Sequence, residues 1–277
     1  MKNIYIIASS SLSAVMLLLG LAFTMSAMTS CQSSDQGNDD ESLAVDSIVV
    51  EKKSKFVEVK VNADFPTSGS DLLRNIIGEY ISESCGDMYN GSYVNGDSIV
   101  AFYANYYNES FLKDVKEIGS VGSAYQKTIS VKKVDEGKNY VSFETVDYEY
   151  SGGMRAYTIT TGITIRKSDG RRFGYDMLKN QNSSEFRKLV KYGLKDYLEK
   201  EFGQSYTSDE ELSETLMNAN VDYIDLPDAA PYITKDGVKF SYGEGEIAVN
   251  ATGAPYFVIP FAKIAPYLTK ALQDILD

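Results

Sequence analysis

The spacing of apolar residues changes along this chain, and that change restricts the folds open to it. Between residues 55 and 61, valines alternate with charged residues, as in a half-buried strand. From 72 to 118, apolar residues recur every three or four positions, which predicts two consecutive core helices. Between 124 and 167 the alternation returns, with turns at Glu136-Gly137-Lys138 and Ser151-Gly152-Gly153. These patterns predict an α+β fold in which antiparallel sheets pack against helices.

The second half of the chain repeats this mixture of helices and strands. By length, the folded part could form one large domain or two small ones, with a sizeable core in either case. The predicted elements are, in order, a helix from Ser183 or Ser184 to about Gly203, a short helix opened by a Ser208 and Glu211 capping box, a hairpin around Asp236-Gly237, a strand at 257–260 and a C-terminal helix opened by Pro266.

The first thirty residues have the layout of a secretory signal. Lys2 carries the only charge in this stretch, and an uncharged apolar run leads to small residues and then to Cys31. This resembles a bacterial lipoprotein signal peptide over residues 1–30, with Cys31 as the lipidated residue. The alternative is an uncleaved membrane anchor, because residues 3–28 are long enough to span a bilayer. Either arrangement predicts that the remainder of the chain is extracytoplasmic.

Residues 31–49 begin with Cys31 and continue as an acidic segment without aromatic residues. This composition predicts a disordered tether with a reach of roughly 20–25 Å. Gln32 rather than Asp follows Cys31, which resembles signals for outer-membrane sorting, and the acidic run resembles surface-export tethers. We therefore expect acyl groups on Cys31 to hold the protein in the outer membrane, in the periplasmic or the surface leaflet.

Charge and the absence of histidine exclude several classes of function. The chain has 39 acidic and 27 basic residues and a formal net charge of -12, which disfavours nucleic acid and favours a cationic partner. Without histidine, a Ser-His-Asp triad, a Cys-His pair and His-containing zinc sites are impossible. Cys31 and Cys85 are too few for a zinc site made of cysteines alone. We expect neither a metal nor a cofactor.

Paired carboxylates are the remaining catalytic option. Asp147 and Glu149 would share one face of a strand, and Glu244 and Glu246 stand close together in a glycine-rich segment. A carboxylate-dependent cell-wall hydrolase using Glu244 and Glu246 is therefore an alternative. The simpler interpretation is a solvated strand face and a turn, because 39 acidic residues must lie somewhere on the surface. No catalytic residue is assigned on this basis.

Tyrosines gather around the second predicted turn. The chain has 21 tyrosines and no tryptophan, and three of the tyrosines flank the paired glycines. If exposed, they could stack on sugar rings or anchor a protein partner, and a neighbouring arginine could meet an anionic group. The candidate binding residues are Tyr148, Tyr150, Gly152, Gly153, Arg155 and Tyr157.

Three segments, taken in order, resemble one group of bacterial proteins. They are YEYSGGMRAYTITTGITIRKSDGRRFGYDML at 148–178, YITKDGVKFSYGEGEIAVNATG at 232–253 and YFVIPFAKIAPYL at 256–268. Together they resemble the extracytoplasmic region shared by the RsiV-type lysozyme-sensing anti-sigma factors and the PdaC-type peptidoglycan deacetylases. The resemblance covers most of residues 50–276.

The resemblance implies two consecutive subdomains after the tether, a PdaC-like one at 50–145 and an RsiV-like domain of unknown function at 146–277. It also implies recognition of a lysozyme-like cationic protein or of cell-wall glycan. The chain departs from the family pattern, since Met154 and Arg155 replace the usual Ala-His and the deacetylase domain is missing. We therefore expect a binding module, while a structural envelope lipoprotein without a soluble ligand remains open.

Overall fold

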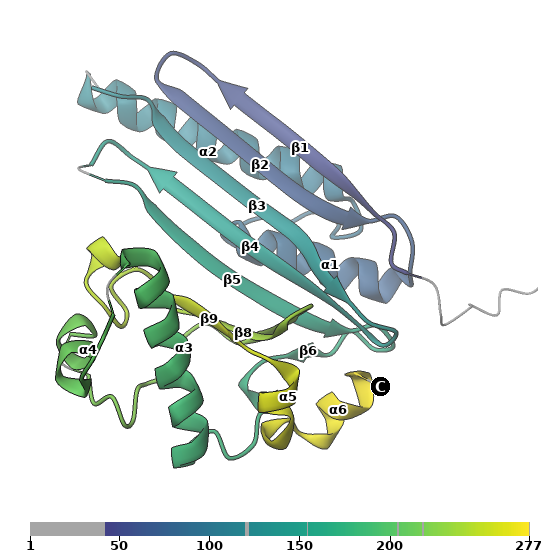
Figure 1. The fold of residues 1–277 in the computed structure, drawn as a ribbon. Coiled ribbons are helices and arrows are strands. Elements are labelled where there is room, and N and C mark those ends of the chain that lie inside the picture. The colour runs from purple at the N-terminus through teal and green to yellow at the C-terminus, as the bar shows by residue number, and fades with distance from the viewer. Residues whose placement is uncertain (1–41, 120–121, 154, 204, 218, 277) are drawn as a thin grey trace, which may run out of the picture. The chain divides into compact units, whose positions relative to one another are not determined.

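A six-stranded sheet is the frame of the folded part (Figure 1). The computed structural model describes residues 42–119, 122–153, 155–203, 205–217 and 219–276, which belong to one compact unit. Cys31 and the predicted signal peptide lie outside the described residues. The strands lie side by side in chain order as β1 (Val45–Lys53), β2 (Val57–Pro66), β3 (Tyr125–Glu136), β4 (Tyr140–Tyr150), β5 (Tyr157–Arg166) and β6 (Arg172–Phe173).

The β2–β3 pair is the parallel one in an otherwise antiparallel sheet. Two helices, α1 (Asp71–Ser84) and α2 (Gly96–Ile118), connect these strands, and a crossover of this length is what a parallel pair requires. Both predicted helices are thus confirmed. Their bounds follow from local chemistry, because Ser70 and Asn95 cap the N-termini and Gly119 ends α2 in the left-handed conformation.

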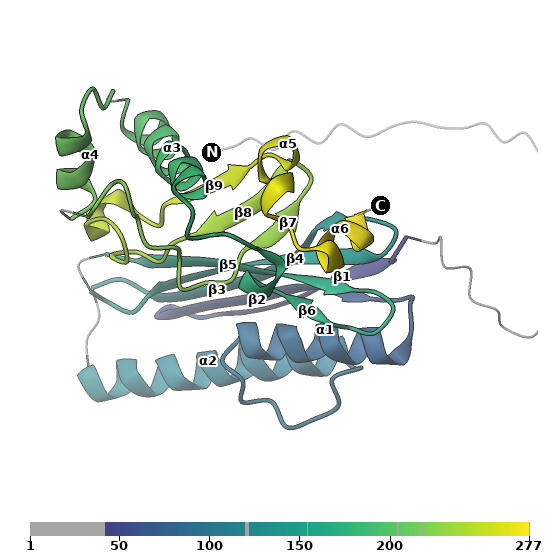
Figure 2. The same cartoon turned by 90° about the horizontal axis from the view of Figure 1, so that it is seen from below.

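One face of the sheet packs on α1 and α2 (Figure 2). Alternate residues of a strand point to opposite faces, so Val57, Val59 and Val61 all point toward the helices and are fully buried. Ile77 of α1 and Tyr103 of α2 are buried against them. This apolar layer is the core of the N-terminal part.

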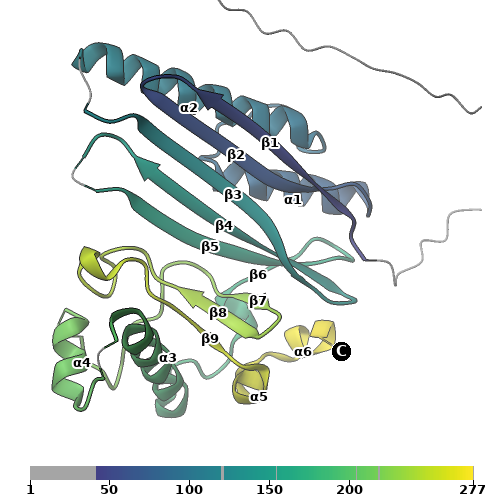
Figure 3. The ribbon, with the colours of Figure 1, turned by 45° about the horizontal axis from the view of Figure 1, so that its top comes forward.

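The C-terminal part lies against the opposite face, beside β5 (Figures 2 and 3). The Tyr232 hydroxyl donates to Glu144 Oε2 at 2.6 Å, and the Ile233 N–H donates to Thr164 Oγ1 at 2.8 Å. These bonds fix the second layer to the first. Its elements are α3 (Ser184–Phe202), α4 (Asp209–Thr215), the small antiparallel sheet β7 (Tyr232–Thr234), β8 (Gly237–Ser241) and β9 (Tyr256–Ile259), α5 (Phe261–Ile264) and α6 (Lys270–Leu276).

The first sheet continues across the expected boundary between residues 145 and 146. That boundary lies inside β4, which pairs with β3 on one side and with β5 on the other. The prediction of a single C-terminal helix is also wrong. Short helical segments replace that helix, and Leu268 between them forms an isolated bridge with Leu178. The capping box of Ser208 and Glu211 is confirmed.

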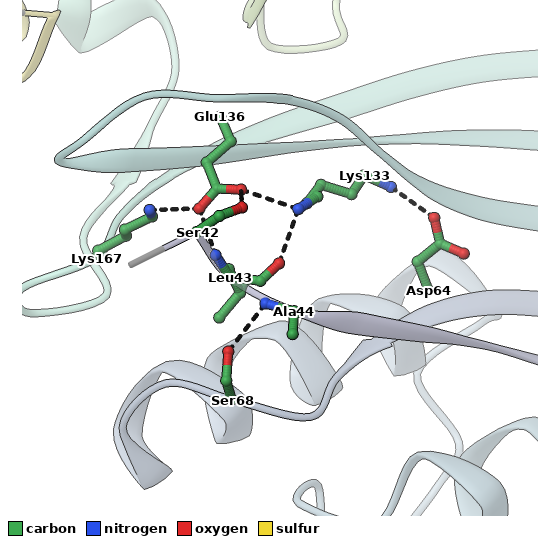
Figure 4. Close-up of polar contacts among 8 residues, drawn as sticks. All are labelled: Ser42, Leu43, Ala44, Asp64, Ser68, Lys133, Glu136 and Lys167. Atoms are coloured by element: carbon green, nitrogen blue, oxygen red, sulfur yellow. Dashed lines mark hydrogen bonds and ion pairs between the residues drawn. The ribbon is translucent and has the colours of Figure 1, made fainter. Parts of the chain in front are cut away.

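Order begins earlier than the tether prediction of 31–49 allowed, since residues 45–49 belong to β1. Just before β1, the chain is held by Glu136 at the end of β3 (Figure 4). The Leu43 N–H donates to Glu136 Oε1 at 2.6 Å, and the Ser42 hydroxyl donates to Oε2 at 2.8 Å. Lys133 Nζ donates to the Leu43 carbonyl at 2.7 Å and to Glu136 at 2.9 Å. Within the described part, no helix is both long and apolar enough to cross a bilayer.

Candidate functional site

The sheet divides the predicted binding residues between its two faces. Tyr148 and Tyr150 lie near the end of β4, and Tyr157 begins β5 directly opposite Glu149. Because neighbouring residues alternate, Tyr157 points to the helix side while Tyr148 and Tyr150 point to the other side. The three tyrosines therefore do not form one site, although they flank the same turn.

Tyr148 and Tyr150 stand on the sheet face opposite α1 and α2. On this face β7 lies against β3, β4 and β5, with Tyr232 hydrogen-bonded to Glu144 of β4, and the remainder over β1 and β2 is open (Figure 1). Both side chains are half-buried, and the Tyr148 hydroxyl donates to Gln126 Oε1 at 3.2 Å. The same face carries polar residues of β2, such as Glu58 and Lys60, with side chains 47% and 43% exposed. It combines aromatic rings with hydrogen-bonding groups, which suits recognition of a polar ligand.

The glycines have a structural reason of their own. Gly152 has φ +84°, a backbone conformation that side chains disfavour. A Cβ at this position would also lie 2.7 Å from the ring of Tyr125. Gly153 meets neither restriction, because its Cβ would contact only the Arg155 carbonyl at 3.8 Å. Gly152 is needed to build the turn, whatever the surface above it binds.

On the helix side, Asp147 and Glu149 share a buried lysine. Lys127 of β3 is 3% exposed, and its Nζ lies 2.8 Å from Asp147 Oδ1 and 2.9 Å from Glu149 Oε2. The Nζ also lies 4.9 Å from the ring centre of Tyr107 in α2. Sequence reasoning missed Lys127, although it stands at an inward position of β3 between Tyr125 and Ile129.

Burial dominates the proton equilibria of this cluster. It raises the pKa of Asp147, and the attraction of Lys127 only partly offsets that rise. Burial likewise raises the pKa of the Tyr107 hydroxyl and of the Cys85 thiol to about 12 each. Tyr157 also has a raised pKa, through burial and a hydrogen bond with Glu149. The cluster is an interior ion-pair network that joins β3 to β4.

The second carboxylate pair holds backbone groups. Glu244 Oε1 accepts the Thr158 N–H at 2.8 Å, and Oε2 lies 3.7 Å from Arg155 Nη1. Glu246 accepts the N–H groups of Asp228 and Gly243 at 2.7 and 2.6 Å. Glu244 thereby covers the free edge of β5, and Glu246 closes its own turn. Among the described residues, no group of acidic or cysteine side chains has the arrangement of a metal site.

A groove of about 1040 Å³ lies at the opposite edge of the sheet. It runs along residues 46–50 of β1 and is closed on the other side by residues 92–97, which include the start of α2. Arg74 of α1 also lines it, with its side chain 33% exposed. None of the predicted binding residues lies in this groove, and no sequence pattern pointed to it.

Comparison with known proteins finds a family match to part of the chain. Residues 176–262 match a family described as "Protein of unknown function (DUF3298)". A DUF3298 family protein from Bacteroides fragilis NCTC 9343 has a similar structure, with 19% identity, a TM-score of 0.68 and coverage of 85% of this chain and 98% of its own. Another, from Pseudomonas aeruginosa PAO1, has 16% identity, a TM-score of 0.58 and the same coverage. No curated protein matches the chain. At these identities the structural likeness shows the fold alone.

Proposed function

We propose that this protein is a lipid-anchored, extracytoplasmic binding module of the bacterial envelope, which recognises a lysozyme-like cationic protein or cell-wall glycan. Acyl groups on Cys31 would attach it to the outer membrane. The resemblance of residues 148–178, 232–253 and 256–268 to the RsiV-type and PdaC-type extracytoplasmic regions supports this proposal.

One observation carries the choice of binding over hydrolysis: the four carboxylates that could have formed a catalytic pair already have structural partners. Asp147 and Glu149 are bound to Lys127, with side chains only 20% and 18% exposed. Glu244 and Glu246 hold backbone N–H groups, and the Glu244 side chain is 15% exposed. A general acid and base must reach the substrate, and these groups are committed elsewhere.

The sheet face that carries Tyr148 and Tyr150 supplies the corresponding surface for recognition. Tyr148 and Tyr150 present aromatic rings on it, and the net charge of -12 favours a cationic protein at long range. Aromatic rings also stack on sugars, so the same surface suits glycan. The two ligand classes differ in one respect, because binding of a cationic protein depends strongly on salt.

Calorimetric titration of residues 39–277 tests the proposal. The fragment should begin at Asp39, because a start within β1 would remove the Ser42 and Leu43 contacts with Glu136. Lysozyme would be titrated at low and at moderate salt, with cell-wall fragments as a parallel titrant. Heat with lysozyme that decreases at the higher salt would support a receptor for a cationic protein, whereas salt-independent heat with the fragments would support glycan recognition.

Absence of heat with both titrants would contradict the proposal and favour a structural lipoprotein. Release of soluble products from cell-wall fragments would contradict it in the other direction. The hydrolase alternative would then require that this activity be lost when Glu244 and Glu246 are both replaced by Gln. Activity that survived the double replacement would exclude these two carboxylates as its source.

A further inference from the structure

The outer edge of β1 is a nine-residue strand edge that pairs with β2 on one side only. Such an edge offers free N–H and C=O groups to another strand. The other long edge, at β5, is covered by the chain itself, because Glu244 accepts the Thr158 N–H and β6 pairs with Thr164 and Ile165. Along β1, the groove of about 1040 Å³ opens beside residues 46–50 instead.

The hydrogen bonds at the two ends of β1 show which residues direct their backbone N–H and C=O groups to the free edge. The Thr67 N–H donates to the Ala44 carbonyl at 2.9 Å, and the Ser54 N–H donates to the Val57 carbonyl at 2.8 Å. The register between these points has no bulge, so even-numbered residues of β1 bond to β2. The odd-numbered residues therefore direct their backbone groups to the free edge, and Val49 is the central one.

We infer that β1 pairs antiparallel with β1 of a second copy of this chain, about a two-fold axis at Val49. In this register Val49 faces Val49 of the other copy, and Ser47 faces Glu51, as backbone-bonded pairs. Between them Ile48 faces Val50. The nine residues of β1 are then all paired, and the two sheets become one twelve-stranded sheet.

In this register two charged side chains of each β1 strand face residues of opposite charge on the other copy. The neighbouring two-fold registers do not have this property. It places Asp46 opposite Lys52 of the other copy, twice across the axis, and these two residues make no ion pair with any described residue. Val49 is 48% exposed in the single chain and would be covered at the axis. A shift of two residues in either direction would leave Asp46 opposite an uncharged residue.

A charge exchange tests this register directly. Sedimentation equilibrium of residues 39–277 should show a dimer, and Asp46→Lys or Lys52→Glu alone should weaken it on the order of tenfold, because each creates two like-charge pairs. The double variant Asp46→Lys, Lys52→Glu restores opposite charges and should restore the dimer. Circular dichroism and thermal melting of each variant would verify that the fold is unchanged.

Val49→Pro is the independent second variant. An outward-facing edge position tolerates proline in the single chain, but proline removes the donor of both central bonds, so the variant should be a folded monomer. A wild-type protein that is monomeric at every concentration would overturn the inference. A dimer whose affinity is unchanged by Val49→Pro and by the charge changes would also overturn it, since another surface would then form the contact.

Discussion

Gly152 combines φ +84° with a close approach to the Tyr125 ring, so its replacement has a defined cost. We expect Gly152→Ala to lower the free energy of unfolding by about 1–3 kcal/mol, through backbone strain and displacement of Tyr125. Gly153→Ala is the matched control and should change stability by less than about 0.5 kcal/mol. Urea denaturation would measure both, and equal effects of the two replacements would contradict this account of the turn.

Lys127 neutralises two carboxylates that point into the same interior. Lys127→Met should destabilise the fold by about 3 kcal/mol, because Asp147 and Glu149 would remain together without their cation. In the variant, the pKa of Asp147, which burial already raises, should lie further above that of the unfolded chain. The variant should therefore be relatively most stable at acidic pH and lose stability as pH rises through the folded-state pKa of Asp147.

Denaturation midpoints of the variant and the wild type between pH 4 and pH 7 would test this sign, and a stability difference independent of pH would contradict it.

The sequence showed Asp147 and Glu149 on one strand face but not their partner. A lysine within an alternating strand is normally solvated, and its burial depends on α2, which lies outside the local pattern.

At the scale of elements, Glu136 fastens the segment before β1 to the end of β3. Burial raises the pKa of Glu136, but hydrogen bonds from Leu43, Lys133, Lys167 and Ser42 outweigh it and lower the pKa to about 2. A carboxyl whose pKa falls from 4.5 to about 2 on folding stabilises the fold above pH 4.5. That contribution is lost as the pH falls through about 2.

Glu136→Gln should therefore cost about 1–3 kcal/mol at neutral pH, the range for hydrogen bonds to charged groups, and the difference from wild type should disappear near pH 2. Urea denaturation across this pH range would measure it. Hydrogen exchange at Leu43 would show whether the loss is local to the fastened segment. A difference that persisted unchanged at pH 2 would contradict the role of the ionised carboxyl.

Most elements could be predicted because each carries its own signal. The α1, α2 and α3 helices have apolar periodicity with capping residues or terminal glycines. In β3–β5, inward-facing and outward-facing residues alternate, and turns bound the strands. β1 could not be predicted in the same way. None of its residues is fully buried, since it is an edge strand, and it follows an acidic segment without an apolar pattern.

At the scale of the whole molecule, the candidate site depends on contacts that local sequence patterns do not predict. The turn at 151–153 was predicted, but its tyrosines separate because the β4–β5 register sets Tyr157 opposite Glu149, on the face that Tyr148 and Tyr150 do not share. The contact of Glu244 with Thr158 joins residues 86 positions apart. Only the packing of the C-terminal layer on β5 brings them together, and no spacing along the chain encodes that.

The proposed anchor gives a further prediction for the whole protein. Cys31→Ser should abolish incorporation of labelled palmitate and move the protein from the membrane fraction to the soluble fraction, because acyl chains supply its membrane affinity. The folded unit should be unaffected, as judged by thermal melting. Membrane retention without palmitate label would contradict lipidation and favour the uncleaved anchor.

The most direct test of the central claim is whether the sheet face that carries Tyr148 and Tyr150 binds the ligand. With the titrant that gives heat, the variant Tyr148→Ala, Tyr150→Ala should bind roughly tenfold or more weakly than the wild type. Tyr192→Ala is the control, since Tyr192 is 64% exposed on α3 and lies outside this face. Unchanged affinity in a folded Tyr148 and Tyr150 variant, or equal loss in the Tyr192 variant, would contradict recognition through this face.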